Sequence, residues 1–334
     1  MKFSKSLDRR SFTPALSVVA FTFVANLYAQ NLEINPVVIT AARTPQPLSQ
    51  VLASVSIITR QDIDKSQATS LADLLRGEAG FEFGRTGGPG STTSFFLRGQ
   101  ESKNVVVLID GVRSQTDGIG ALTVTNVPLS QVERVEILRG NAGALYGEAA
   151  IGGVISVTTR VGGGEPKAYG STLLGSRRTS ELTAGFGGKL NDISFDLNGG
   201  SAETLGFSSM NASKNLTVNP DHDSSRSQFV GASVNQKIDS DLRLGLRANA
   251  KNSTTDYDVD NNWSGLKTDT HQFQIKSDTV GAFASRRITE AWMMDIDVSQ
   301  SHFAYEAIKN GTVATRGRYE GQQNVLRWTN AYAL

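Results

Sequence analysis

The hydrophobic residues of this chain follow two different patterns, and the change comes near residue 160. Before that point, short apolar runs lie between polar or glycine-rich stretches. Residues 105–109 are continuously apolar, which is typical of a strand buried on both faces. Residues 132–138 mix apolar and charged side chains, which predicts a half-buried strand that ends at Arg139-Gly140, where glycine permits a turn.

Further elements complete a small α+β domain over residues 51–161. Besides the two strands above, the pattern predicts a strand at 55–59, a helix from Arg60, a helix at 70–75 with Thr69 or Ser70 as N-cap, strand residues at 81, 83, 95 and 97, and a strand at 154–157 after Gly152-Gly153. Two polar, glycine-rich loops at 85–94 and 114–123 cannot pack as core, so we expect them to be exposed.

Residues 162–166 form a flexible break between two domains, and after it apolar and polar residues alternate with a period of two. Apolar side chains occupy alternate positions in four runs: Leu182, Ala184 and Phe186; Ile193, Phe195 and Leu197; Leu242, Leu244, Leu246 and Ala248; Met294, Ile296 and Val298. This is the period of strands with one apolar and one polar face. Soluble β-sandwiches share it, but charges deep in the polar faces favour strands between lipid and an aqueous lumen.

Residues 1–29 predict a secretory signal peptide that is cleaved after Ala29. Lys2, Lys5, Arg9 and Arg10 precede a mostly apolar run. An uncleaved anchor is the alternative, but the run contains Pro14 and is shorter than the about 20 residues that a spanning helix needs.

The net charge and the residue composition of the chain exclude several classes of function. The net charge is +1, which offers no bulk attraction for nucleic acid. The absence of cysteine excludes disulfides, thiolate zinc sites and cysteine nucleophiles. The three histidines, His222, His271 and His302, lie outside any catalytic motif, so we expect surface histidines and no enzyme activity.

The first domain carries a recognisable order of motifs. It contains I-T-R-Q-D-I, L-A-D-L-L, F-L-R-G, V-L-I-D-G-V-R, V-E-R-V-E-I-L-R-G, A-L-Y-G and A-I-G-G-V-I-S-V-T-T-R. This order resembles the plug domain of TonB-dependent outer-membrane receptors. The resemblance implies an α+β plug domain (51–161) followed by antiparallel transmembrane β-barrel strands (166–334), located in the outer membrane of a Gram-negative bacterium.

Residues 30–50 form an extended, proline-containing arm ahead of the plug. Within it, Val37, Val38, Ile39, Thr40 and Ala41 are β-prone and lack a local strand partner in the sequence. They predict either an ordinary first strand or a segment that adds to another protein's sheet edge. They resemble the TonB box, which implies the periplasmic partner TonB.

The same resemblance implies roles for the glycine-rich plug loops. In such receptors, loops at these places reach the outer face and touch ligand. The candidates in this chain are Gly88, Ser91, Thr92, Gln115, Thr116 and Asp117.

The barrel is expected to be incomplete. Residues after 166 supply eight or nine strands, with long loops at 204–226 and 252–271 alternating with short turns. Barrels of about eight strands are filled by their own side chains, so a plug of about a hundred residues requires a wider one. We therefore interpret the chain as an N-terminal part of a longer receptor that is monomeric when complete.

The long loops contain regularly spaced aspartates that are not an EF-hand, because Asn261 and Lys267 replace the required glycine and glutamate. A solvated acidic loop is the simplest interpretation. The cobalamin branch of the receptor family binds calcium through loop aspartates, and the matching residues here are Asp221, Asp223, Tyr257, Asp258 and Asp269. One aspartate of that pattern is replaced near Ser208.

Three functions remain open from the sequence. The first is TonB-dependent transport of cobalamin across the outer membrane, with outer-membrane lipid around the barrel and calcium as a structural ion. The second is a ferric-siderophore receptor of the same fold. The third is a secreted β-protein that binds without transport.

Overall fold

The computed structural model describes residues 37–40, 43, 46–114, 127–215, 218–259 and 267–332, with only the backbone at 313–316. They all belong to one compact unit, residues 36–334. The expected signal peptide lies outside the described residues, as do Ala41 and residues 115–126. No helix in the described part of the chain has both the length and the hydropathy needed to cross a membrane.

The first part of the unit is the expected α+β domain. Its main sheet has the strand order β3-β9-β10-β7-β8, in which only β10 and β7 pair in parallel. The elements of this part are β1 (Val37–Val38), β2 (Gln46–Pro47), η1 (Leu48–Gln50), β3 (Ser54–Thr59), α1 (Arg60–Ser66), α2 (Leu71–Arg76), β4 (Phe81–Arg85), β5 (Thr93–Leu97), β6 (Gln100–Glu101), η2 (Ser102–Asn104), β7 (Val105–Ile109), β8 (Val112–Arg113), η4 (Leu129–Gln131), β9 (Val132–Arg139), α3 (Gly143–Tyr146) and β10 (Gly153–Thr159). Strands β4, β5 and β6 form a separate small sheet.

The helices begin where side chains cap their free N–H groups. Thr59 forms a capping box with Asp62 at the start of α1, and Ser70 accepts a hydrogen bond from the Asp73 N–H at the start of α2. Of the two N-caps that the sequence allowed for the second helix, Ser70 is therefore the one that the structure uses.

Strand β7 is buried on both faces, as its continuous apolar run predicts. Val105 and Val107 join the core between the sheet and helices α1 and α2. Val106 and Leu108 join a second cluster that includes Ala142 and packs on the other face. The plug sheet is thus covered on both sides, which fixes β7 and the turn that follows it.

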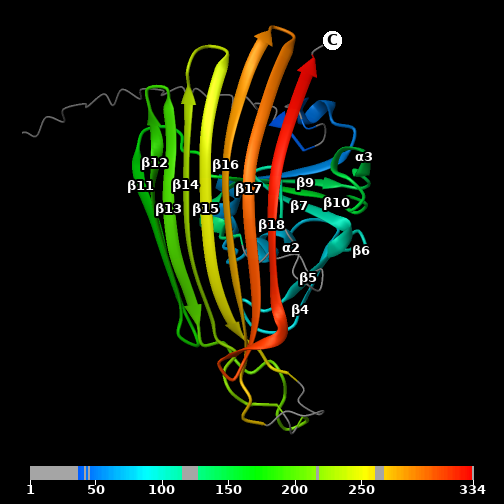
Figure 1. Cartoon of the computed structure of the whole chain (residues 1–334), viewed down its shortest axis with the longest axis vertical. Coiled ribbons are helices and arrows are strands. Elements are labelled where there is room, and N and C mark those ends of the chain that lie inside the picture. The colour runs from blue at the N-terminus through cyan, green and yellow to red at the C-terminus, as the bar shows by residue number, and fades with distance from the viewer. Residues whose placement is uncertain are drawn as a thin grey trace, which may run out of the picture. The chain divides into compact units, whose positions relative to one another are not determined.

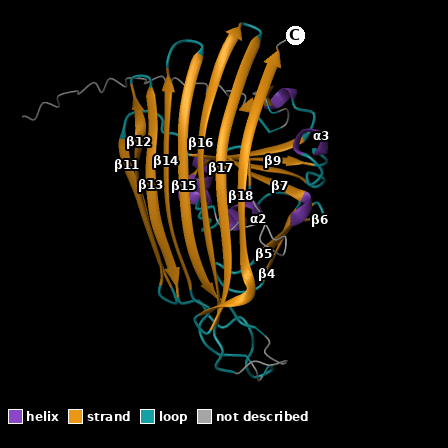
Figure 2. Cartoon of the chain, in the orientation of Figure 1, coloured by secondary structure: helices purple, strands orange, loops and turns teal. Residues whose placement is uncertain are grey.

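The second part is one antiparallel sheet of eight long strands in sequence order (Figures 1 and 2). The strands are β11 (Lys167–Gly175), β12 (Thr179–Leu190), β13 (Ile193–Thr204), β14 (Ser225–Lys237), β15 (Leu242–Asp256), β16 (His271–Thr289), β17 (Trp292–Lys309) and β18 (Thr312–Tyr332). Within the described residues, β11 and β18 each pair on one side only, so the sheet is open. The expected fold class is confirmed.

The two faces of this sheet alternate as the sequence predicts. Leu182, Leu197, Leu246 and Val298 are exposed on one face, whereas polar neighbours such as Asp196 are buried on the other. The plug packs against the polar face, because Ser233 of β14 donates a hydrogen bond to the Arg160 carbonyl oxygen and Arg327 of β18 donates one to the Gly111 carbonyl oxygen. The exposed apolar side chains therefore lie on the face away from the plug.

The connections differ in length at the two ends of the sheet. At one end, residues 191–192, 238–241 and 290–291 make short turns. The described parts of the two long connections, residues 205–215, 218–224, 257–259 and 267–270, lie together at the other end, where residues 176–178 and 310–311 make short turns. Two adjacent long loops thus stand at one end of the sheet.

Candidate functional site

The TonB-box candidate is docked on the plug. Val38 is fully buried, and β1 pairs with β2 through Val37 opposite Pro47 and Val38 opposite Gln46. The expectation that this segment lacks a local partner is wrong, because the chain turns back within eight residues of Val38 and supplies one.

A buried carboxylate completes this docking. The Glu136 Oε2 atom accepts hydrogen bonds from the Ile39 N–H (3.0 Å), the Thr40 N–H (2.8 Å) and the Thr40 hydroxyl (2.7 Å). Arg134 donates to the Val37 carbonyl oxygen and contacts Glu136 Oε1 at 2.8 Å. Sequence reasoning missed Glu136, because 96 residues separate it from Thr40.

The plug-loop candidates are only partly exposed. Gly88 and Ser91 are buried, and the Ser91 hydroxyl donates to the Gly88 carbonyl oxygen at 2.7 Å. The expectation of full exposure is wrong for these two residues, because the loop packs against barrel residues, with the Phe207 ring 3.6 Å from where a Gly88 Cβ would lie. Thr92 is half-buried. Gln115, Thr116 and Asp117 lie outside the described residues.

Barrel residues 207–210 connect this plug loop to the acidic loops. The Ser209 side chain lies 3.3 Å from a Cβ built at Gly87, and the Ser209 N–H donates to Asp223 Oδ2 at 2.8 Å. The Ser208 hydroxyl and the Met210 N–H each donate to Asp258 Oδ2 at 2.8 Å. Ser208, near which the resemblance implied a replaced aspartate, therefore acts as a hydrogen-bond donor to the cluster.

Three of the five metal-ligand candidates converge. One carboxylate oxygen from each of Asp221, Asp223 and Asp258 lies within 4.8 Å of the other two. Three points this close lie within about 2.8 Å of a common centre, which approaches the roughly 2.3–2.6 Å of calcium–oxygen bonds. The donors are all hard oxygens, so the cluster fits a calcium ion.

The other two candidates line the same cavity but contact other partners. Asp269 is buried, pairs with Lys309 at 2.8 Å and accepts a hydrogen bond from Asn310 at 2.8 Å. Tyr257 packs its ring against His271 and Phe273. The cavity has a volume of about 260 Å³. It is lined by Asn219, Asp221, Asp223, Asp256, Tyr257, Asp258, Val259, Asp269, Thr270 and His271.

The electrostatics of the cavity favour a bound cation. Burial raises the pKa of Asp221 and of Asp223, and the nearby Asp258 carboxylate raises both pKa values further. Hydrogen bonds from Ser209 oppose the rise in the pKa of Asp223. Burial and the neighbouring carboxylates thus both disfavour the charged forms, and a divalent cation bound here would offset the repulsion.

Sequence reasoning missed two residues that line this cavity. The Asn219 amide donates to Asp221 Oδ2 at 3.0 Å and so orients a candidate ligand. His271, expected to be a plain surface histidine, also lines the cavity. For Asn219, the signal in the sequence was its position two residues before Asp221. For His271, no sequence signal indicated a place in the cavity.

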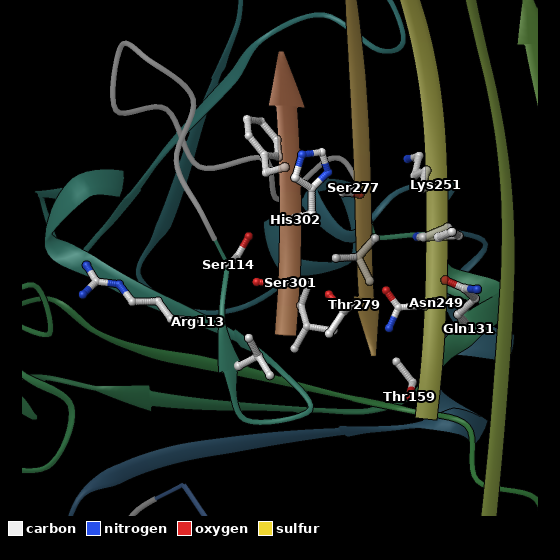
Figure 3. Close-up of a pocket in the computed structure, with 16 residues that line it drawn as sticks. Arg113, Ser114, Gln131, Thr159, Asn249, Lys251, Ser277, Thr279, Ser301 and His302 are labelled. Carbon is white, nitrogen blue, oxygen red and sulfur yellow. The ribbon is translucent and has the colours of Figure 1, made fainter. Parts of the chain in front are cut away.

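The plug and the sheet enclose a second, smaller cavity of about 70 Å³ (Figure 3). The residues labelled in Figure 3 come from both parts: Arg113, Ser114, Gln131 and Thr159 from the plug, and Asn249, Lys251, Ser277, Thr279, Ser301 and His302 from the strands. The lining also includes the apolar residues Ile109, Val112, Val127, Pro128, Ala250 and Phe303. Nearby, Asp297 of β17 pairs with Arg247 at 2.6 Å and with Arg327 at 3.5 Å. Polar and apolar side chains therefore share this contact between plug and strands.

Residues 47–154 match the family model of the TonB-dependent Receptor Plug Domain. This match covers most of the α+β domain, which packs against the polar face of a long antiparallel sheet. This part of the chain is therefore a plug domain of the TonB-dependent receptor type.

A more specific relative is the vitamin B12 transporter BtuB of Vibrio vulnificus. It is 35% identical over 242 residues, which cover 71% of this chain and 38% of that protein. The chain thus spans well under half the length of this relative.

Solved structures share the fold at lower identity. The ferripyoverdine receptor of the Pseudomonas aeruginosa outer membrane superposes with a TM-score of 0.70 at 15% identity, over 88% of this chain and 41% of that one. A ferric enterobactin receptor from the same species gives a TM-score of 0.65 at 19% identity, over 86% and 47%. Identities this low support the fold and no more.

Proposed function

We propose that this chain is the plug and first barrel segment of an outer-membrane receptor that imports cobalamin with energy from TonB. The observation that carries the proposal is the identity with the vitamin B12 transporter. It spans 242 residues, whereas the plug match covers only residues 47–154, so the similarity continues into the strands and loops.

The geometry supports the membrane location and the ion site in this proposal. Exposed apolar side chains on the face away from the plug suit lipid contact. The acidic cavity suits a calcium ion held by Asp221, Asp223 and Asp258. Because residues 207–210 contact both this cavity and the plug loop, an ion there would order the surface on which ligand binds from outside.

Ligand binding tests the substrate directly. Purified full-length receptor is titrated with cyanocobalamin, once with calcium and once with a chelator, and with a ferric siderophore in a parallel series. We expect cobalamin to bind, and to bind more tightly with calcium, because the ion would pre-order the loops. Binding of the siderophore instead of cobalamin would overturn the choice of substrate.

Uptake tests the coupling to TonB. Val38→Pro removes a backbone donor that strand addition needs, so cobalamin binding should persist while uptake is lost. Val38→Ala keeps the donor and is the matched control. Equal uptake by the proline and alanine variants would show that this segment is not the coupling site.

A further inference from the structure

A cavity of about 350 Å³ lies at the end of the long sheet that has the short turns. Its lining includes Asn235 and Lys237 of β14. Both lie on the same face as Ser233, which contacts the plug, because alternate residues of a strand share a face. The cavity therefore opens on the plug side of the sheet. Under the proposed function the short turns are periplasmic, so an imported solute leaves the receptor at this end.

Four exposed basic side chains from four different strands line this cavity. They are Lys189 of β12, Lys237 of β14, Arg243 of β15 and Arg287 of β16. None of them forms an ion pair or a side-chain hydrogen bond with another described residue. Further along the same face, by contrast, Arg247 and Arg327 both pair with Asp297. The basic groups at the short-turn end therefore keep their N–H donors for a ligand.

The aspartates around this cavity do not pair with the basic groups. Asp192, Asp239 and Asp241 also belong to the lining. Asp239 Oδ1 accepts the N–H groups of Asp241 and Leu242, each at 2.7 Å, and so closes its own turn. Asp241 accepts a hydrogen bond from the Ser240 hydroxyl at 3.1 Å. The lining thus has one more basic group than acidic groups, and two of its three carboxylates are already engaged within the turn.

The two ends of the sheet differ in charge. Asp221, Asp223 and Asp258 bring carboxylates together at the end with the long loops, whereas the four basic groups gather at the end with the short turns. Like charges that gather without partners repel one another, and protein surfaces usually intersperse both signs. An anion at the short-turn end would remove this repulsion, so a negatively charged group is favoured there.

We propose that Lys189, Lys237, Arg243 and Arg287, here called the basic mouth, bind the phosphate group of a solute that is leaving the receptor. Guanidinium and ammonium groups are the side chains that bind phosphate oxygens best. Cobalamin contains a phosphodiester, so the identity of the solute rests on the proposed function, whereas phosphate binding does not. Phospholipid head groups carry the same chemistry, but the apolar side chains that suit lipid lie on the other face. Because the basic groups are exposed to salt, binding should be weak, which allows release.

Two adjacent arginines of β16 provide a matched pair of substitutions. Arg287 lines the cavity, whereas Arg286 precedes it in the strand and therefore lies on the opposite face. Arg287→Gln and Arg286→Gln remove the same charge from neighbouring exposed positions. Neither arginine has an ion pair or a side-chain hydrogen bond within the described residues, so neither substitution should disturb the fold.

Thiol protection by inorganic phosphate measures binding without any transported solute. The chain has no cysteine, so Asn235→Cys places a reporter in the lining, with any cysteine elsewhere in the full-length receptor replaced by serine. The ligand-free receptor, in uncharged detergent, is labelled with an uncharged maleimide over a series of phosphate concentrations at constant ionic strength. We expect a saturable fall in labelling rate. Arg287→Gln should raise the half-protecting phosphate concentration about two- to fivefold, as for one exposed ionic contact, and Arg286→Gln should not. Protection no greater than that by sodium chloride, or equal effects of the two substitutions, would overturn the phosphate site.

Reconstitution separates a solute phosphate from a lipid phosphate. In phosphatidylglycerol vesicles without added phosphate, the Asn235→Cys thiol should be labelled as fast as in uncharged detergent. Slower labelling in the vesicles would assign the basic mouth to lipid head groups and overturn its role for a solute.

Uptake tests the role in solute exit. Arg287→Gln should lower the initial rate of cobalamin uptake by up to the same two- to fivefold and leave cobalamin binding at the outer face unchanged, whereas Arg286→Gln should change neither. Equal uptake by the two variants would overturn the exit role. If the receptor does not bind cobalamin, the proposed function fails, while protection by phosphate still decides whether the basic mouth is an anion site.

Discussion

Replacing Asp258 by asparagine should have opposite effects on the acidic loops with and without calcium. The three carboxylate oxygens lie within 4.8 Å of one another. Two unit charges at that separation repel by about 1 kcal/mol at the dielectric constant of water and by about 3.5 kcal/mol at an effective value near 20. Asp221 is exposed, so the lower figure applies to its pairs.

The asparagine variant removes two of the three repulsive pairs. Its remaining side-chain oxygen can still accept the hydrogen bonds of Ser208 and Met210. Without calcium, the loops should therefore gain about 2–4.5 kcal/mol in stability, of which about 1 kcal/mol comes from the pair with Asp221 and the rest from the pair with buried Asp223. With calcium, a charged ligand is lost, and calcium affinity should fall about tenfold to a hundredfold, as for lost bonds to a charged group of about 1.5–3 kcal/mol.

Calorimetric calcium titration and limited trypsin digestion measure these two effects. Lys214 and Lys267 are exposed and lie in the two long loops, so their cleavage rates report loop opening. We expect the Asp258→Asn variant to be cleaved more slowly than the parent in chelator and faster in calcium. Asp192→Asn, in a short turn at the other end of the sheet, is the control. A change of the same sign in both conditions would refute the electrostatic reasoning.

Three other predictions follow from contacts described above. Gly90→Ala should destabilise the receptor by about 1–3 kcal/mol in thermal unfolding, because Gly90 has φ +85° and an added Cβ would lie 2.1 Å from the Ser225 hydroxyl, whereas Gly84→Ala, with nothing within 4 Å, should not. As the pH is lowered, calcium affinity should begin to fall at a higher pH than the ordinary aspartate pKa of 3.8 implies, because the raised pKa values of Asp221 and Asp223 let protons compete with calcium at that higher pH. Calcium titrations at a series of pH values check this. Thr59→Ala should cost about 1 kcal/mol of plug stability in denaturant unfolding, through loss of the Thr59 side of the capping box.

Local patterns were enough to predict most of the fold. The apolar run of β7 predicted burial on both faces, because no polar side chain in it needs water. The alternation in β12, β13, β15 and β17 predicted which side chains face away from the plug. The motif order predicted the plug domain, which the family match confirms.

Contacts between distant residues could not be predicted in the same way. Nothing near Thr40 in the sequence indicates that Glu136 binds it, because the pairing depends on the position of β9 in the sheet. The spacing of the aspartates suggested one cluster, yet Asp269 pairs with Lys309 because the 310–311 turn brings that lysine beside it. Burial of Gly88 depends likewise on a barrel loop over a hundred residues away.

The contact between plug and strands has a mechanical consequence. It is made in several places by glycines: Gly90 and Gly111 of the plug, and Gly231 of strand β14, where an added Cβ would lie 2.5 Å from the Gln131 amide. Large apolar side chains that interlock must repack before two surfaces can slide. At these glycines the missing side chain makes room for a polar group of the other surface: the Ser225 hydroxyl, the Arg327 guanidinium or the Gln131 amide. Each hydrogen bond exchanged for water changes the net free energy by only about 1 kcal/mol. Movement of the plug against the strands would therefore exchange polar contacts for water at these places, and would require repacking where apolar groups meet, as where the Phe207 ring covers Gly88.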